Sequence, residues 1–170
     1  MPDDQRASDG LASCRYSVHI SNAQAAESTG DFDSATASYS SALSLANTAE
    51  LRSSLESAIA AMKARREGEE TARQVQEWLG AAAEAEKAGD LDTAAAWYRK
   101  AADVNDPGAM HKLGLAYYNG NGVEQDINKT IELLTKAAEV GNSASMFQLG
   151  LVYHAGDGVG KDYAKALEWY

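Results

Sequence analysis

The sequence predicts an all-α protein, an antiparallel solenoid of helix pairs with roughly eight helices. Three observations lead to this class. Only 2 of the 170 residues are proline, and the chain is rich in alanine, leucine, glutamate and lysine, which favour helix. Apolar residues recur at helical spacing, and no segment alternates as a strand does. A block of 36 residues occurs twice, and periods of this length indicate stacked repeats.

The repeat is clearest in two glycine-containing segments, "AYYNGNGVEQD" (116–126) and "VYHAGDGVGKD" (152–162). When residues 100–134 are moved forward by 36, fifteen of the thirty-five positions are identical without a gap. Such a match indicates that one structural unit has been repeated along the chain.

Each unit is expected to contain two helices. The first should cover 106–118, because Asp106 can cap a helix that has Pro107 at its first position. The second should cover 126–140, where apolar residues form one stripe at helical spacing. These apolar residues are Ile127, Ile131, Leu134 and Ala138.

The pattern continues upstream in a shorter form. The segment "GDLDTAAAWYRKAA" (89–102) matches the second helix of the unit, but a turn of only Gly89-Asp90 precedes it. The related segment "GDFDSATASYSSAL" (30–43) predicts a helical hairpin over 21–46. A further helix is expected over 48–66, followed by a charged stretch in which Gly68 should kink or break the helix.

These patterns divide the chain into three parts. We expect residues 1–15 to be disordered, as chain termini often are. Residues 16–70 should form a helical hairpin with a linking helix. Residues 71–170 should form repeats, the last of them incomplete, because the second unit stops at Tyr170 before its second helix reaches full length.

The Gly-x-Gly loops could be taken for a phosphate cradle or a calcium loop. A phosphate cradle follows a strand and usually carries a lysine, whereas here a helix precedes and no such lysine follows Gly122. A calcium loop needs several oxygen ligands, and Asp157 is the single carboxylate within Gly-Asp-Gly. We therefore expect the glycines to allow positive φ between antiparallel helices. Gly114 and Gly150 fall within helices, where they should allow close helix packing.

Composition argues against several other classes of function. The net charge of -10 without a basic cluster makes nucleic acid an unfavourable partner. The three histidines and the single Cys14 do not form a metal-ligand pattern, so we expect no metal, no cofactor and no catalytic set. No apolar stretch is long enough to span a membrane, and no secretory leader is seen. We expect a cytoplasmic protein.

The segment "LGLAYYNGNGVEQDINK" (113–129), with the alanine pair that follows Lys100 and Lys136, resembles a Sel-one-like repeat. This family is related to the tetratricopeptide repeats, which the hairpin segments over 21–46 and 71–105 also resemble. Two residues depart from the pattern, Thr130 in place of alanine and Leu133 in place of tryptophan. The resemblance implies a right-handed superhelix that serves as a scaffold for other proteins, without catalytic residues. Residues 31–66 also resemble microtubule-interacting-and-trafficking modules, which are three-helix bundles.

In tetratricopeptide-type solenoids the first helices line the concave surface, so their exposed stripe is the candidate partner site. This stripe, called here the first-helix stripe, has one set in each repeat at matching positions: His111, Leu115 and Tyr118, then Phe147, Leu151 and His154. An alternative interpretation is that the stripe packs on the neighbouring repeat.

The predicted function is a non-catalytic scaffold or adaptor that binds protein or peptide partners. The alternative is a regulatory or targeting segment of a larger, enzymatic polypeptide. The last helix contains Leu167, Trp169 and Tyr170, whereas a terminal repeat normally presents a polar face. We expect this edge to fray or to be buried by a second copy or by further sequence.

Overall fold

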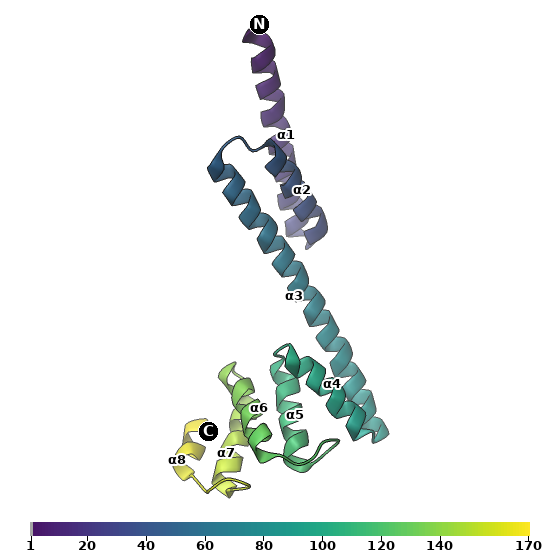
Figure 1. Cartoon of the computed structure of the whole chain (residues 1–170), viewed down its shortest axis with the longest axis vertical. Coiled ribbons are helices and arrows are strands. Elements are labelled where there is room, and N and C mark those ends of the chain that lie inside the picture. The colour runs from purple at the N-terminus through teal and green to yellow at the C-terminus, as the bar shows by residue number, and fades with distance from the viewer. Residues whose placement is uncertain (1) are drawn as a thin grey trace. The chain divides into compact units, whose positions relative to one another are not determined.

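The computed structural model describes the backbone of residues 2–170 and the side chains of residues 11–170. Within this range the chain forms helices and no strand, which confirms the all-α class (Figure 1). The helices are α1 (Pro2–Ser28), α2 (Phe32–Leu45), α3 (Ala49–Ala88), α4 (Leu91–Asp103), α5 (Pro107–Asn119), α6 (Ile127–Glu139), α7 (Ser143–Ala155) and α8 (Tyr163–Trp169).

The chain divides into two compact units, residues 1–71 and 72–170, and α3 contributes to both. The expected break at Gly68 is wrong, because α3 runs through this residue without interruption. Gly68 lies between arginines and glutamates, which are good helix formers, and a helical glycine costs only about 1 kcal/mol relative to alanine. The charged stretch therefore continues one helix.

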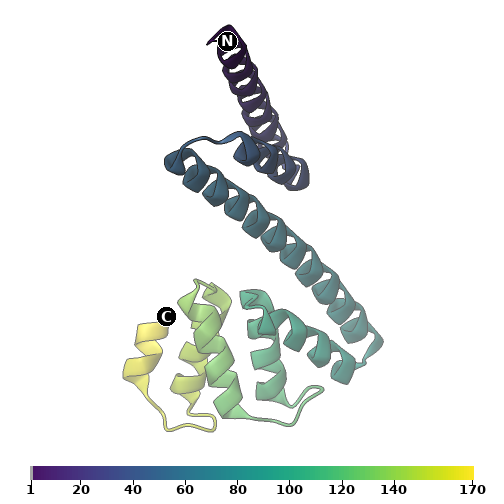
Figure 2. The same cartoon turned by 45° about the horizontal axis from the view of Figure 1, so that its top comes forward.

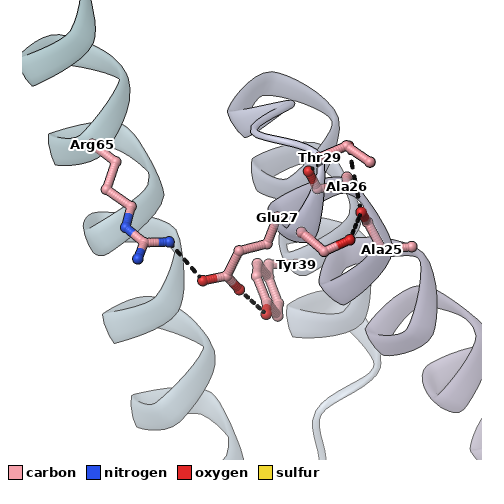
Figure 3. A network of polar contacts seen from close by, with 7 residues as sticks. Ala25, Ala26, Glu27, Thr29, Tyr39 and Arg65 are labelled. Atoms are coloured by element: carbon pink, nitrogen blue, oxygen red, sulfur yellow. Dashed lines mark hydrogen bonds and ion pairs between the residues drawn. The ribbon is translucent and has the colours of Figure 1, made fainter.

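The first unit packs α1, α2 and the first part of α3 around a small core. The core contains Ala23, Ala35, Tyr39, Ala42, Ala46, Leu55 and Met62. Beside it, the Glu27 carboxylate accepts a hydrogen bond from the Tyr39 hydroxyl at 3.2 Å and pairs with Arg65 at 2.9 Å (Figure 3). Burial and the bond to Glu27 raise the pKa of Tyr39. One carboxylate thus joins all three helices.

The N-terminal segment differs from the expectation. Residues 1–15 were expected to be disordered, whereas α1 is helical from Pro2 onward. Pro2 stands at the first helical position, where its missing N–H is harmless, and no further proline follows in the helix. The packed end of α1, which includes Ala23, gives the helix a nucleus from which it extends toward the N-terminus.

The second unit consists of the end of α3 followed by α4 to α8, each antiparallel to the helix before it (Figures 1 and 2). A carboxylate or amide oxygen caps each helix from α4 on by accepting a hydrogen bond from a backbone N–H three residues later, as predicted for Asp106. These caps are Asp90, Asp106, Asp126, Asn142 and Asp162. The loops between α5 and α6 and between α7 and α8 lie at the same end of the unit.

The helical glycines allow the two helices of a repeat to approach closely, as the sequence predicted. A Cβ at Gly114 would lie 3.1 Å from the Leu134 side chain, and one at Gly150 would lie 2.5 Å from the Tyr170 ring. Thr130, which replaces the usual alanine, is fully buried. Its hydroxyl donates to the carbonyl oxygens of Gly114 and Asp126 at 3.1 and 3.0 Å, so the departure from the repeat pattern leaves no unpaired polar group.

Candidate functional site

Each glycine loop connects the two helices of one repeat and contacts the repeat before it. Gly120, Gly122, Gly156 and Gly158 all have positive φ, between 68° and 76°, which confirms the conformation predicted for them. Gly122 lies against the N-terminus of α4, so close that a Cβ would come within 1.9 Å of the Leu91 carbonyl oxygen. Gly158 lies in the same way against Ile127, the first residue of α6. The second glycine of each loop therefore packs on the preceding repeat.

On α5, two residues of the first-helix stripe contact the next repeat. His111 Nδ1 lies 3.0 Å from the hydroxyl of Ser145, which is fully buried on α7. Burial, with a smaller contribution from the nearby Lys112 charge, lowers the pKa of His111. The Tyr118 hydroxyl donates to the Asp157 carboxylate at 2.5 Å, and this bond raises the pKa of Tyr118. Both side chains thus hold two repeats together.

On α7, the matching residues are exposed. Phe147 is 57% exposed and Leu151 is 38% exposed. The Phe147 ring lies 5.8 Å from the ring of Tyr170, and the His154 ring lies 5.2 Å from that of Tyr163. These two contacts are made within the same repeat, with Tyr163 of α8 and with Tyr170, which follows α8, whereas His111 and Tyr118 contact the following repeat.

Leu115 has a different environment, because it lines a cavity of about 180 Å³ between the end of α3, α4 and α5. Its apolar lining comes from Leu91, Ala94, Ala95, Leu115 and Ala116, and its polar lining from Glu86, Tyr98, Lys112, Asn119 and Asn121. We call this cavity the α4–α5 cavity. Of the six predicted residues, Leu115 lines the α4–α5 cavity and the other five do not.

A polar network crosses the α4–α5 cavity. Glu86 on α3 accepts a hydrogen bond from the Tyr98 hydroxyl and lies 3.6 Å from the Lys112 ammonium. Burial, followed by the bond to Glu86, raises the pKa of Tyr98 to about 12. The Glu86 carboxylate therefore links α3 to α4 through Tyr98 and to α5 through Lys112.

Sequence reasoning did not single out Glu86, Lys112 and Asn119. Lys112, Leu115 and Asn119 lie at i, i+3 and i+7 on α5, so they form a stripe beside the predicted one. This spacing was available in the sequence. The search for aromatic and apolar residues selected the neighbouring stripe instead.

No group of three or more histidine, cysteine, aspartate or glutamate side chains that could hold a metal ion occurs among the described residues. Within the same range, none of the helices has the length and apolar character needed to cross a membrane.

The model of the Sel1 repeat family matches residues 85–106, 107–142 and 143–170. These segments are contiguous and together cover half of the chain. The chain belongs to the Sel1 repeat family. The three Sel1 repeats correspond to the end of α3 with α4, to α5 with α6, and to α7 with α8.

Two solved structures are similar to this chain. A protective antigen of uropathogenic Escherichia coli strains that displays an SLR fold is 27% identical over 98% of this chain, with a TM-score of 0.51. A Sel1 repeat protein from Oxalobacter formigenes is 33% identical over 46% of this chain, with a TM-score of 0.44. This chain spans about a third of each of them, 31% and 32%. A comparison with curated proteins gives no match.

Sel1 repeats are typically protein-interaction scaffolds, and membership of the family implies protein partners in general. The arrangement found here suits that role, because stacked helix hairpins form an extended surface on which a partner can bind.

Proposed function

We propose that this protein is a non-catalytic scaffold or adaptor that binds a segment of a partner protein at the α4–α5 cavity. The observation that carries this proposal is the cavity itself, with an apolar floor and a polar rim supplied by three helices. Concave sites of this composition are where proteins most often bind ligands. The first-helix stripe contributes Leu115 to the floor, and Lys112 and Asn119 extend the site along α5.

The chemistry of the cavity indicates the kind of segment that would bind. A volume of about 180 Å³ is close to that of cavities that hold one benzene ring, so one apolar side chain fits. Asn119 and Asn121 line the cavity. The Asn119 amide donates to the Leu115 carbonyl at 3.0 Å, and the remaining groups of both amides can bind the N–H and C=O groups of an extended backbone. The partner segment is thus extended, with one large apolar residue flanked by uncharged ones.

A display library of random peptides, selected on the purified protein, tests this proposal. The affinity of a selected peptide would then be measured by fluorescence anisotropy. Asn119→Ala and Leu115→Ala should each weaken binding about tenfold, as expected for contacts at the centre of an interface. Lys136→Ala is the matched control, because Lys136 lies exposed on α6, pairs with Glu132 and does not line the cavity. Equal affinities for all variants would contradict the assignment of the cavity.

Self-association is a second candidate function, favoured by a separate observation. Five large apolar residues of the last repeat are exposed: Phe147, Leu151, Tyr163, Leu167 and Tyr170. Apolar patches shared by neighbouring helices mark interaction sites on soluble proteins. We propose that copies of this chain are among its partners. Sedimentation velocity over a concentration series should show a mass above 18.0 kDa, and a constant monomer would refute self-association.

A further inference from the structure

The α4–α5 cavity can be compared with the equivalent place one repeat later. Helices α4 and α6 are both 13 residues long, and each begins directly after an aspartate cap. Helices α5 and α7 are also both 13 residues long, and they begin at Pro107 and Ser143. Positions 36 residues apart are therefore equivalent in the two helix pairs. The packing of α6 on α7 shows how the same scaffold looks when other side chains occupy it.

Three alanines line the cavity where the next repeat has larger side chains. The pairs of equivalent residues are Ala94 and Thr130, Ala95 and Ile131, and Ala116 and Val152. Of the larger residues, Thr130 and Val152 are fully buried, and Ile131 packs on the core that contains Leu149. The α4–α5 cavity therefore lies where side-chain volume that fills the next repeat is missing.

The remaining walls of the cavity favour an aromatic ring. Tyr98 lines the cavity and is larger than its equivalent, Leu134. The Lys112 ammonium lies 5.9 Å from the centre of the Tyr98 ring. A second ring beside Tyr98 would gain from the same ammonium, because cations attract the faces of aromatic rings within about 6 Å. Two rings also attract each other in tilted or offset arrangements, and an aliphatic side chain gains neither of these contacts.

The charges of the cavity favour a ring without a polar group. The Glu86 carboxylate accepts a hydrogen bond from the Tyr98 hydroxyl and lies 3.6 Å from the Lys112 ammonium, so its partners are already inside the protein. The floor of leucine and alanine side chains offers no partner to a buried hydroxyl, and an unpaired hydroxyl there would be unfavourable. A volume of about 180 Å³ suits one six-membered ring and is small for an indole.

We propose that the α4–α5 cavity selects one phenylalanine side chain of the partner, and that Ala95, Ala116 and Lys112 decide this preference. The inference rests on the proposed function, since the phenylalanine belongs to the extended partner segment. Ala95 and Ala116 provide the space for the ring, and Lys112 provides the cation beside it. The junction of α6 and α7 lacks this space, because Ile131 and Val152 stand at the equivalent places.

Residues copied from the next repeat can fill the cavity. The double variant Ala95→Ile, Ala116→Val, called here the filled variant, takes both residues from equivalent positions of the same fold. It should bind a phenylalanine peptide about tenfold more weakly or worse, because the ring loses its buried apolar contacts. Ala96→Ile is the matched control, since Ala96 lies exposed on the same helix and does not line the cavity. Circular dichroism would check the folding of each variant, and Ala116→Val alone provides a milder second test.

The variant Lys112→Met separates the effect of the cation from that of the space. Methionine keeps an unbranched side chain but carries no charge. The affinity for the phenylalanine peptide should fall about fivefold, whereas the affinity for the same peptide with leucine should change by less than about twofold. The pair between Lys112 and Glu86 is half exposed, and such pairs contribute little to stability, so the fold should be kept.

The probes are peptides selected from a random display library on the wild-type protein. One of them would be synthesised with phenylalanine and with leucine, tyrosine, tryptophan or alanine in its place. Fluorescence anisotropy would measure each affinity for each variant. On the wild type, the phenylalanine peptide should bind about fivefold more tightly than the leucine peptide and about tenfold or more above the tryptophan and alanine peptides.

Each other result overturns a distinct statement. A library without any binding peptide, or peptides that bind the filled variant as tightly as the wild type, would overturn the proposed function together with this inference. Peptides that lose affinity for the filled variant but bind best with leucine, tyrosine or tryptophan would overturn the phenylalanine preference alone. Equal losses for the phenylalanine and leucine peptides in Lys112→Met would overturn the role of the cation.

Discussion

Replacing Gly122 with alanine adds one methyl group at the point where two repeats approach most closely. The Cβ would lie 1.9 Å from the Leu91 carbonyl oxygen, 2.2 Å from its carbonyl carbon and 2.6 Å from the Asp92 nitrogen. All three are backbone atoms, so no side-chain rotation can relieve the overlap. The separation must grow to at least 3.0 Å, which moves the loop or the start of α4 by about 1 Å.

The cost can be divided into two parts. Gly122 has φ of 68°, and an alanine in the left-handed region costs about 1–2 kcal/mol. Forcing packed backbone apart costs about 1–3 kcal/mol more. The expected loss in free energy of unfolding is therefore about 2–5 kcal/mol. Gly141→Ala isolates the first part, because Gly141 has φ of 91° but no atom within 4 Å of its Cβ position.

The structure supports this choice of control. Asn105, which occupies the position of Gly141 one repeat earlier, adopts φ of 65° with a side chain present. Gly141→Ala should therefore cost about 1 kcal/mol. The loss in free energy of unfolding for Gly158→Ala should lie between those of Gly141→Ala and Gly122→Ala. The neighbour of Gly158 is the Ile127 side chain, which can move more easily than backbone.

Urea denaturation followed by tryptophan fluorescence measures these losses. All three tryptophans, Trp78, Trp97 and Trp169, lie in the second unit, so the signal reports on the repeats and not on the first unit. Equal losses for Gly122→Ala and Gly141→Ala would refute the close approach of the loop to α4. No loss in either variant would refute the conformational argument as well.

Three further predictions concern individual residues. Gly68→Ala should stabilise the first unit by up to about 1 kcal/mol, because Gly68 lies within a continuous helix with open space around it; thermal unfolding by circular dichroism measures this. Thr130→Val should cost about 1–2 kcal/mol in urea denaturation, since the buried hydroxyl donates to Gly114 and Asp126, whereas a role in packing alone predicts no loss. Because the pKa of His111 is lowered by folding, the folded state binds fewer protons than the unfolded state. The contribution of His111 to stability is therefore present above pH about 6.5 and is lost as the pH falls toward the pKa of His111 in the folded state. His111→Gln should therefore lose less stability than the wild type between pH 7 and pH 5, and identical losses would contradict this reading.

Much of the helical structure could be predicted from the sequence because it is local. Asp106 with Pro107, and Asp126 before Ile127, fix where α5 and α6 begin, since the cap carboxylate and the backbone N–H that donates to it lie three residues apart. The spacing of 36 residues gave the hairpins their register, and Gly114 marked the close approach of α5 and α6. The predicted break at Gly68 was wrong because a glycine stops a helix only where neighbouring contacts favour another conformation.

The candidate site was predicted only in part. Helical spacing placed His111, Leu115 and Tyr118 on one side of α5, but it could not say what that side faces. His111 meets Ser145, 34 residues later, and Tyr118 meets Asp157, 39 residues later. Leu115 instead faces a cavity whose other walls come from α3 and α4.

The sequence by itself determined the helices, their caps, the repeat length and the positive φ of the loop glycines, because each depends on residues within a few positions of one another. Only the tertiary structure decided that the second glycine of each loop packs on the preceding repeat, that Glu86 joins Tyr98 to Lys112, and that equivalent residues are buried in one repeat and exposed in the next. Phe147 and His111 occupy the same position in their repeats, but their exposed fractions differ because their neighbours differ. The burial of a side chain depends on the surface that packs against it, and the repeat pattern in the sequence does not describe that second surface.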